Sequence, residues 1–108
     1  MKQIYHLLLK LGIGARYRGF HYLAYAIFLT LEDQSLLLAV TKQLYPRIAK
    51  KYQCTWTSVE RALRMAVSHF WDFGNRPLLE RIAGYPIWER PSVSELIDIL
   101  AGYLSRAA

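Results

Sequence analysis

The sequence contains few of the residues that cross-link or interrupt a chain. Its one cysteine, Cys54, excludes an internal disulfide framework and is typical of a reducing compartment. Only four prolines and six glycines occur among 108 residues, so long stretches can form regular structure. Because 54% of the residues are hydrophobic, the chain has enough apolar material for a core and is not expected to be disordered. We predict one folded domain over residues 1–108.

Long apolar runs are also lacking, and we expect no export signal. The longest uncharged run, residues 19–31, is 13 residues long, whereas a helix needs about 20 apolar residues to cross a bilayer. His6 and Lys10 interrupt the apolar N-terminal segment, which therefore resembles a signal peptide only weakly. We expect a cytoplasmic protein without a membrane partner.

The residue clusters that enzymes use are missing from the sequence. One cysteine and three scattered histidines give no metal-ligand cluster. There is no glycine-rich phosphate loop, and no carboxylate pair stands out. Cys54 could pair with a histidine as a nucleophile, but a structural cysteine in a turn is far commoner. We expect no enzymatic activity, no metal and no cofactor.

Apolar residues recur at helical spacing along almost the whole chain. Thr57 with Glu60, and Ser92 with Glu95, match the capping box that opens a helix. Pro46 suits the first turn of a helix, and it should push Tyr45 away from helical geometry. We predict an all-α, compact bundle of about six to seven helices. The predicted segments are about 4–11, 22–31, 36–44, 46–52, 57–73, 77–83 and a last helix after Ser92.

Positive charge is concentrated in the first part of the chain. Residues 1–64 carry ten Lys and Arg against three Asp and Glu, whereas residues 65–108 carry four against five. The densest part, residues 41–64, contains six basic residues and only Glu60 as an acid. Its short helix, turn and longer helix predict a helix-turn-helix over about 46–73. A basic helix-turn-helix favours DNA binding, although such charges also occur on ordinary solvated helix faces.

The predicted helix over residues 57–73 has an apolar stripe and an opposite polar face. The residues off the stripe are Ser58, Arg61, Met65 and Ser68, and Glu60 and Arg64 flank them. An arginine can hold guanine through two hydrogen bonds, and a glutamate can accept one from cytosine. We predict base contacts from Ser58, Glu60, Arg61 and Arg64. The residues predicted to contact phosphates are Lys42, Arg47, Lys50, Lys51 and Thr57.

Two segments resemble a known family. Residues 41–52, TKQLYPRIAKKY, resemble the T-K-x-L-Y-P-x-I-A-K-K-[FY] stretch of the stage zero sporulation protein A family, a family of sporulation response regulators. Residues 59–64, VERALR, resemble its V-E-R-A-I-R segment, and Trp71, Gly74 and Asn75 follow at the matching places. Weaker similarities upstream and downstream extend the resemblance over nearly the whole chain.

The resemblance implies an all-helical effector domain that binds promoter double-stranded DNA. Family members recognise a short box resembling TGTCGAA and often bind tandem boxes as head-to-tail dimers. The family's base-reading Glu and Arg fall on Glu60 and Arg61, and its second helix arginine falls on Arg64. Ser58 and Met65 stand where the family commonly has Arg and His. A regulator of this kind is expected to contact RNA polymerase. The family's receiver domain is not within these residues, so we expect an excised effector domain or a stand-alone relative.

Fifteen aromatic residues support a second hypothesis. Four of them have no evident core role in the predicted bundle: Tyr17, Trp56, Trp88 and Tyr103. Trp56 could pack under the turn or touch the DNA backbone, and we expect packing. Aromatic residues are enriched in protein interfaces. The alternative is therefore a helical protein-interaction module without specific DNA binding.

Overall fold

In the computed structural model, which describes residues 1–107, every regular element is helical. Six α-helices surround one hydrophobic core, as the sequence predicts. Two short turns of other helical types, the 3-10 turn η1 and the π-helical turn η2, join α2 to α3. The elements are α1 (Lys2–Lys10), α2 (Arg18–Glu32), η1 (Gln34–Leu38), η2 (Val40–Leu44), α3 (Tyr45–Tyr52), α4 (Trp56–Phe73), α5 (Arg76–Ala83) and α6 (Val93–Ala107).

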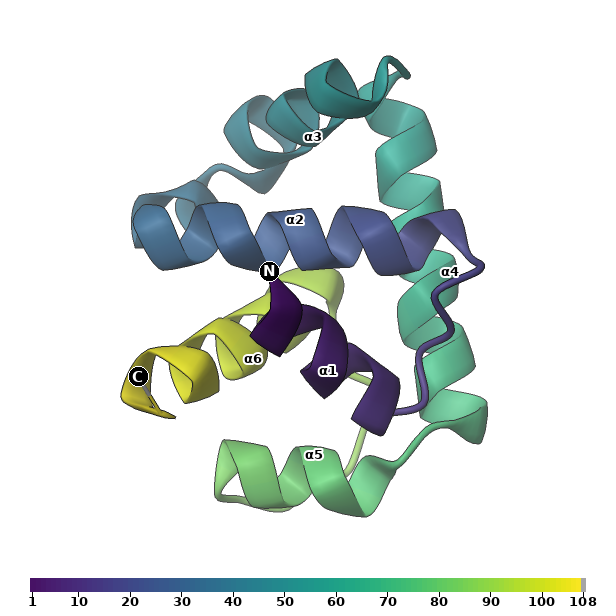
Figure 1. Ribbon diagram of the computed structural model, residues 1–108, viewed down its shortest axis with the longest axis vertical. Coiled ribbons are helices and arrows are strands. Elements are labelled where there is room, and N and C mark those ends of the chain that lie inside the picture. Colours follow the sequence, from purple (N-terminus) through teal and green to yellow (C-terminus); the bar gives the residue numbers. More distant parts are fainter. Residues whose placement is uncertain (108) are drawn as a thin grey trace.

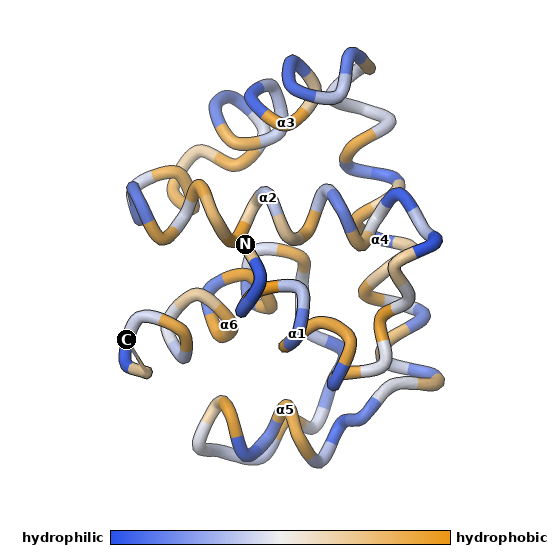
Figure 2. Tube along the Cα trace, viewed as in Figure 1, coloured by the Kyte–Doolittle hydropathy of each residue, from blue (hydrophilic) through white to orange (hydrophobic). Residues whose placement is uncertain are grey.

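Helix α2 lies at the centre of the molecule (Figure 1). It packs against α1, α3, α4 and α6, and α4 crosses one of its ends. Figure 2 shows hydrophobic residues recurring along each helix between hydrophilic ones, the pattern of helices that bury one face. None of the helices described in residues 1–107 combines the length and the apolar character needed to cross a membrane.

Helix α4 begins two residues earlier than the sequence predicts. Thr55, not Thr57, is the N-cap: its Oγ1 accepts a hydrogen bond from the Ser58 backbone N–H at 3.2 Å. Thr57 lies inside the first helical turn, so the predicted capping box of Thr57 with Glu60 is wrong. Both threonines can cap a helix, but Thr55 has the extended backbone that the cap position requires (φ −89°, ψ 153°).

The second predicted capping box is confirmed. The Glu95 N–H donates to Ser92 Oγ at 3.1 Å, and the Ser92 N–H donates to Glu95 Oε1 at 3.1 Å. This reciprocal pair satisfies two backbone donors at the start of α6.

The segment before Pro46 differs from the prediction in two ways. The helix expected over 36–44 is divided into η1 and η2. Tyr45 is helical (φ −61°, ψ −42°), so the predicted break before Pro46 is wrong. The bias of a residue before proline is a preference only. Here it is outweighed because Leu44 and Tyr45 are both buried in the core.

Candidate nucleic-acid interface

Helices α3 and α4 form the predicted helix-turn-helix. They are joined by residues 53–55, and Gln53 there has a left-handed backbone (φ 55°) that reverses the chain. Ile48 and Ala49 of α3 are buried, as are Val59 and Leu63 of α4, and the two helices pack together. The motif spans residues 45–73, within one residue of the predicted start and at the predicted end.

One face of α4 is buried and the opposite face is open. Val59, Leu63, Val67 and Phe70 lie in the core, which confirms most of the predicted apolar stripe. Ala62 and Ala66 on the edge of the stripe are half-buried. The exposed face extends over more than two turns of α4. Its residues are Thr57, Ser58, Arg61, Arg64 and Met65.

Glu60 and Arg64 are paired on one side of this open face. Arg64 Nη2 lies 3.6 Å from Glu60 Oε1, and the side chains are 71% and 29% exposed respectively. Tyr45 lies beside them and is buried. Burial raises the pKa of its hydroxyl, the Glu60 carboxylate raises it further, and Arg64 opposes both. The tyrosine hydroxyl therefore stays neutral, and the Glu60 carboxylate pairs with Arg64 while Thr55 caps the helix.

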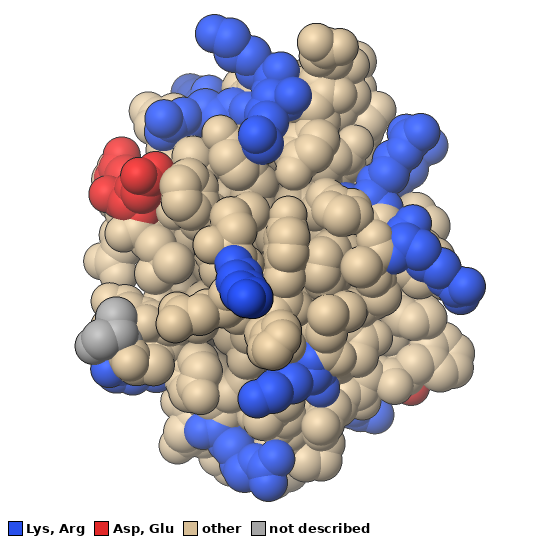
Figure 3. Space-filling model, in the orientation of Figure 1, with Lys and Arg blue, Asp and Glu red and all other residues tan. Residues whose placement is uncertain are grey.

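Four of the five residues predicted to contact phosphates lie on α3 or in η2 just before it. Lys42, Arg47, Lys50 and Lys51 are all exposed. Of these four cations, only Lys51 has an aromatic contact among the described residues. Its Nζ lies 5.0 Å from the ring centre of Tyr25 and 5.8 Å from that of Tyr52. Figure 3 shows basic side chains over α3 and along the edge beside α4, whereas the large acidic patch in that view lies at the end of α2.

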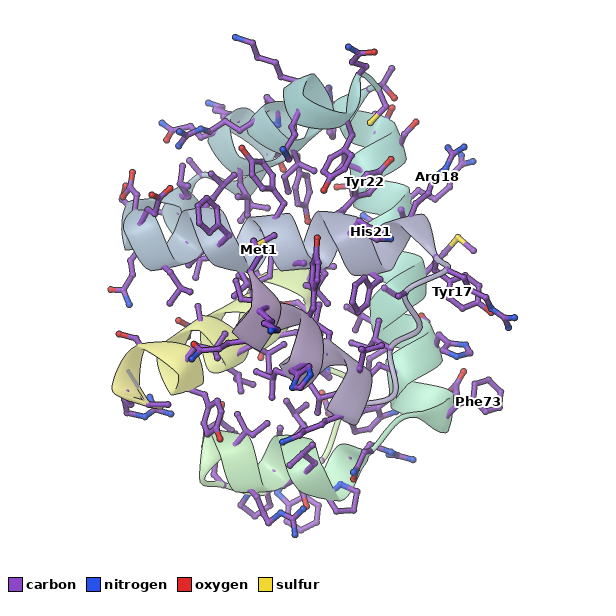
Figure 4. The ribbon with its side chains drawn as sticks, in the orientation of Figure 1. Met1, Tyr17, Arg18, His21, Tyr22 and Phe73 are labelled. Atoms are coloured by element: carbon purple, nitrogen blue, oxygen red, sulfur yellow. The ribbon has the colours of Figure 1, made fainter. Side chains whose placement is uncertain are left out.

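The sequence does not indicate that Arg18 lies beside α4, because only the fold brings it there. Figure 4 shows Arg18 extending outward from the start of α2, beside α4. A hollow of about 310 Å³ separates these helix starts. The side chains that line it are Arg18, Tyr22, Thr57, Ser58, Arg61, Ala62 and Met65.

The sequence does not indicate that Arg90 lies against α4 either. It precedes α6, yet its Nη1 donates a hydrogen bond of 2.6 Å to Ser68 Oγ of α4. Residues 18, 61 and 90 are far apart in the sequence and follow no common spacing. A local sequence pattern therefore cannot predict that all three lie on or beside α4.

The turn of the motif contains Cys54, which is half-buried. Its Sγ lies 3.7 Å from the Tyr22 hydroxyl, and burial together with this hydrogen bond raises the pKa of Tyr22. Trp56, expected to pack under the turn, is 41% exposed and therefore only partly packed. Within residues 1–107, no three side chains of metal-ligating types come together.

A comparison with known protein families identifies the family of this chain. The family model described as sporulation initiation factor Spo0A C terminal matches residues 4–104. The chain belongs to this family. The resemblance carried by residues 41–52 and 59–64 is thereby confirmed. The Spo0A C-terminal family is the DNA-binding domain of a sporulation regulator, and it is not an enzyme family. The match includes all of α2, α3, α4 and α5, and hence the complete helix-turn-helix.

Proposed function

We propose that this chain binds promoter DNA sequence-specifically, as a transcription regulator of the sporulation-initiation type, with α4 in the major groove. The observation that carries the proposal is the open face of α4, on which Arg61 is exposed in the first two turns of a helix whose other face is buried. In a helix-turn-helix, the N-terminal residues of the second helix meet the base edges.

Arg61 is the principal base-reading residue in this proposal. Its guanidinium can donate two hydrogen bonds to guanine O6 and N7, a pairing worth about 1–3 kcal/mol of discrimination. Glu60 accepts from cytosine N4, and Arg64 and Ser58 contact neighbouring bases. The Glu60–Arg64 ion pair does not prevent this, because Arg64 is 71% exposed and an exposed pair stabilises by only about 0–1 kcal/mol.

The phosphate contacts come from the exposed cations around α3, together with Thr57 in the first turn of α4. Lys42, Arg47, Lys50 and Lys51 can bind the backbone without reading sequence. The aromatic rings beneath Lys51 restrict its ammonium group, so less conformational entropy is lost when that group binds a phosphate.

Two protein contacts are part of the proposal. Residues 1–108 act as one effector domain, two copies bind side by side on tandem boxes, and an exposed surface contacts RNA polymerase in the cytoplasm. Trp88 and Phe73 support such contacts, since they are 85% and 78% exposed and large exposed apolar side chains favour interfaces.

The exposed side chains of Trp88 and Phe73 also favour the alternative function, a protein-interaction module without specific DNA binding. An apolar hollow of about 290 Å³ lies beside α4. It is lined by residues that include Ile13, Tyr17, Ala66 and His69. A partner helix or a second copy would bury this surface in the absence of any DNA.

Fluorescence anisotropy separates the two functions. A labelled duplex with two TGTCGAA-like boxes is compared with a scrambled duplex of equal length over a series of salt concentrations. The proposal predicts tighter binding to the box duplex and an affinity that falls steeply with salt. Equal, weak binding to both duplexes would exclude specific recognition and leave the interaction module.

A further inference from the structure

We propose that Arg18 and Arg90 contact DNA phosphates on the two opposite sides of α4, so that the helix is held in the groove from both flanks. The inference rests on the proposed function and adds two residues that are distant from the helix-turn-helix in sequence. Each flank is supported by its own contacts.

On the first flank, α2 approaches α4 closely enough to bring Arg18 to its surface. The neighbouring Gly19 is buried, and a Cβ at this position would lie only 2.6 Å from the Ala62 carbonyl oxygen. Arg18 lines the same hollow as Ser58 and Arg61, and no acidic side chain lines it. Among the described residues, the Arg18 side chain makes no hydrogen bond or ion pair. Its guanidinium is thus available for an anion beside the base-reading residues.

On the second flank, Arg90 lies against α4 from the chain that precedes α6. Its hydrogen bond to Ser68 Oγ fixes the guanidinium at the α4 surface. A hollow of about 370 Å³ there is lined by Arg90, Glu60, Arg64 and Ser68, among others. Because Glu60 is already paired with Arg64, the Arg90 side of the helix retains positive charge.

Helical geometry shows that Arg18 and Arg90 lie on different sides of α4. With 3.6 residues per turn, Glu60 and Arg64 share one side of α4, whereas Ala62 and Met65 lie toward the other. Arg90 lies with the first pair and Arg18 with the second. Arg61 projects between them.

The width of the DNA major groove predicts that arginines on both sides of α4 would lie near phosphates. A helix with its side chains is about 10–12 Å across, and the major groove is about 12 Å wide. A helix that fills the groove has a phosphate backbone on each side. Cations on both flanks then face phosphates, and arginine suits this contact because its fork of donors matches phosphate oxygens.

The test measures how binding depends on salt for Arg18→Ala and Arg90→Ala, with the box and scrambled duplexes. Each phosphate contact contributes about 0.9 to the slope of log K against log salt. We expect each variant to reduce the slope by about 0.9 on both duplexes and to leave the preference between them unchanged. Arg18→Lys and Arg90→Lys should retain the slope, because an ammonium group also binds phosphate.

Arg81→Ala is the matched control, since Arg81 is an exposed arginine on α5, which packs against α6. It removes the same charge and should leave the slope unchanged. An equal reduction in Arg81→Ala, or an unchanged slope in either Arg18→Ala or Arg90→Ala, would overturn the two-sided contact. Phosphate contacts act on any sequence, so the slopes test this inference even if the wild-type protein shows no preference for the box.

Discussion

The backbones of α2 and α4 touch at Gly19 and Ala62. A Cβ on Gly19 would lie 2.6 Å from the Ala62 carbonyl oxygen and 2.9 Å from the Ala66 Cβ, distances that only glycine avoids. This contact sets the position of α2 against the helix-turn-helix. It also places Arg18, the preceding residue, beside the open face of α4.

Gly19→Ala is therefore expected to destabilise the fold. The added methyl group meets backbone that cannot move aside freely, and overpacking of this kind costs about 1–3 kcal/mol. The measurement is the free energy of unfolding in urea. Gly102→Ala in α6 is the control: a Cβ there meets only the flexible end of Arg106 at 3.3 Å. Alanine's helix propensity should make that variant as stable as wild type or up to about 1 kcal/mol more stable. A Gly19→Ala variant as stable as wild type would contradict the close contact.

Thr55→Ala should lower stability more than Thr57→Ala. Thr55 is the N-cap that accepts from the Ser58 N–H, whereas Thr57 lies within the first turn. Loss of an N-cap side chain costs about 0.5–2 kcal/mol. Thermal and urea unfolding of both variants check the assignment. If Thr57→Ala were the more damaging change, α4 would begin at the capping box that the sequence alone suggests.

Thr30→Val should be neutral or stabilising. Among the described residues, Thr30 Oγ1 is buried without a hydrogen-bond partner. A buried polar group without a partner costs about 1–3 kcal/mol, and valine removes that group while keeping the same shape. Urea unfolding measures the change. Thr30→Ser keeps the hydroxyl and loses a buried methyl group, so it should be less stable than wild type. A destabilised Thr30→Val would show that the hydroxyl does have a partner.

Lys51→Ala should weaken binding to all DNA sequences alike. If the ammonium group above Tyr25 and Tyr52 contacts a phosphate, its loss should reduce the salt slope by about 1 and leave the sequence preference intact. Anisotropy with the box and scrambled duplexes gives both quantities. Circular dichroism checks folding, because loss of the cation–π contact costs about 0.5–1 kcal/mol at an exposed site. A loss confined to the box duplex would make Lys51 a base-reading residue instead.

The sequence predicts much of this fold because its signals are local. The apolar stripe from Val59 to Phe70 repeats at helical spacing, and Gly84 has the left-handed backbone (φ 84°) expected where α5 ends. The errors occur where two local signals compete. Thr55 and Thr57 can both cap a helix, and the bias of Tyr45 against helix is outweighed by its burial.

The candidate site is only partly visible in the sequence. The exposure of Arg61 and Arg64 follows from the pattern of α4, so the sequence predicts it. The approach of Arg18 depends on a contact between Gly19 and Ala62, 43 positions away, and that of Arg90 depends on Ser68. Contacts between helices that are distant in the chain have no periodic signal, so only the structure reveals them.

Arg61→Ala tests the central claim most directly. The variant and the wild type are titrated against a box duplex and a set of duplexes in which each base pair of the box is changed in turn. If Arg61 reads a guanine, the variant loses about 1–3 kcal/mol of binding to the intact box and no longer discriminates at one base pair, while discrimination elsewhere persists. A variant that keeps the wild-type preference at every position would contradict the proposal that Arg61 on α4 reads the DNA sequence.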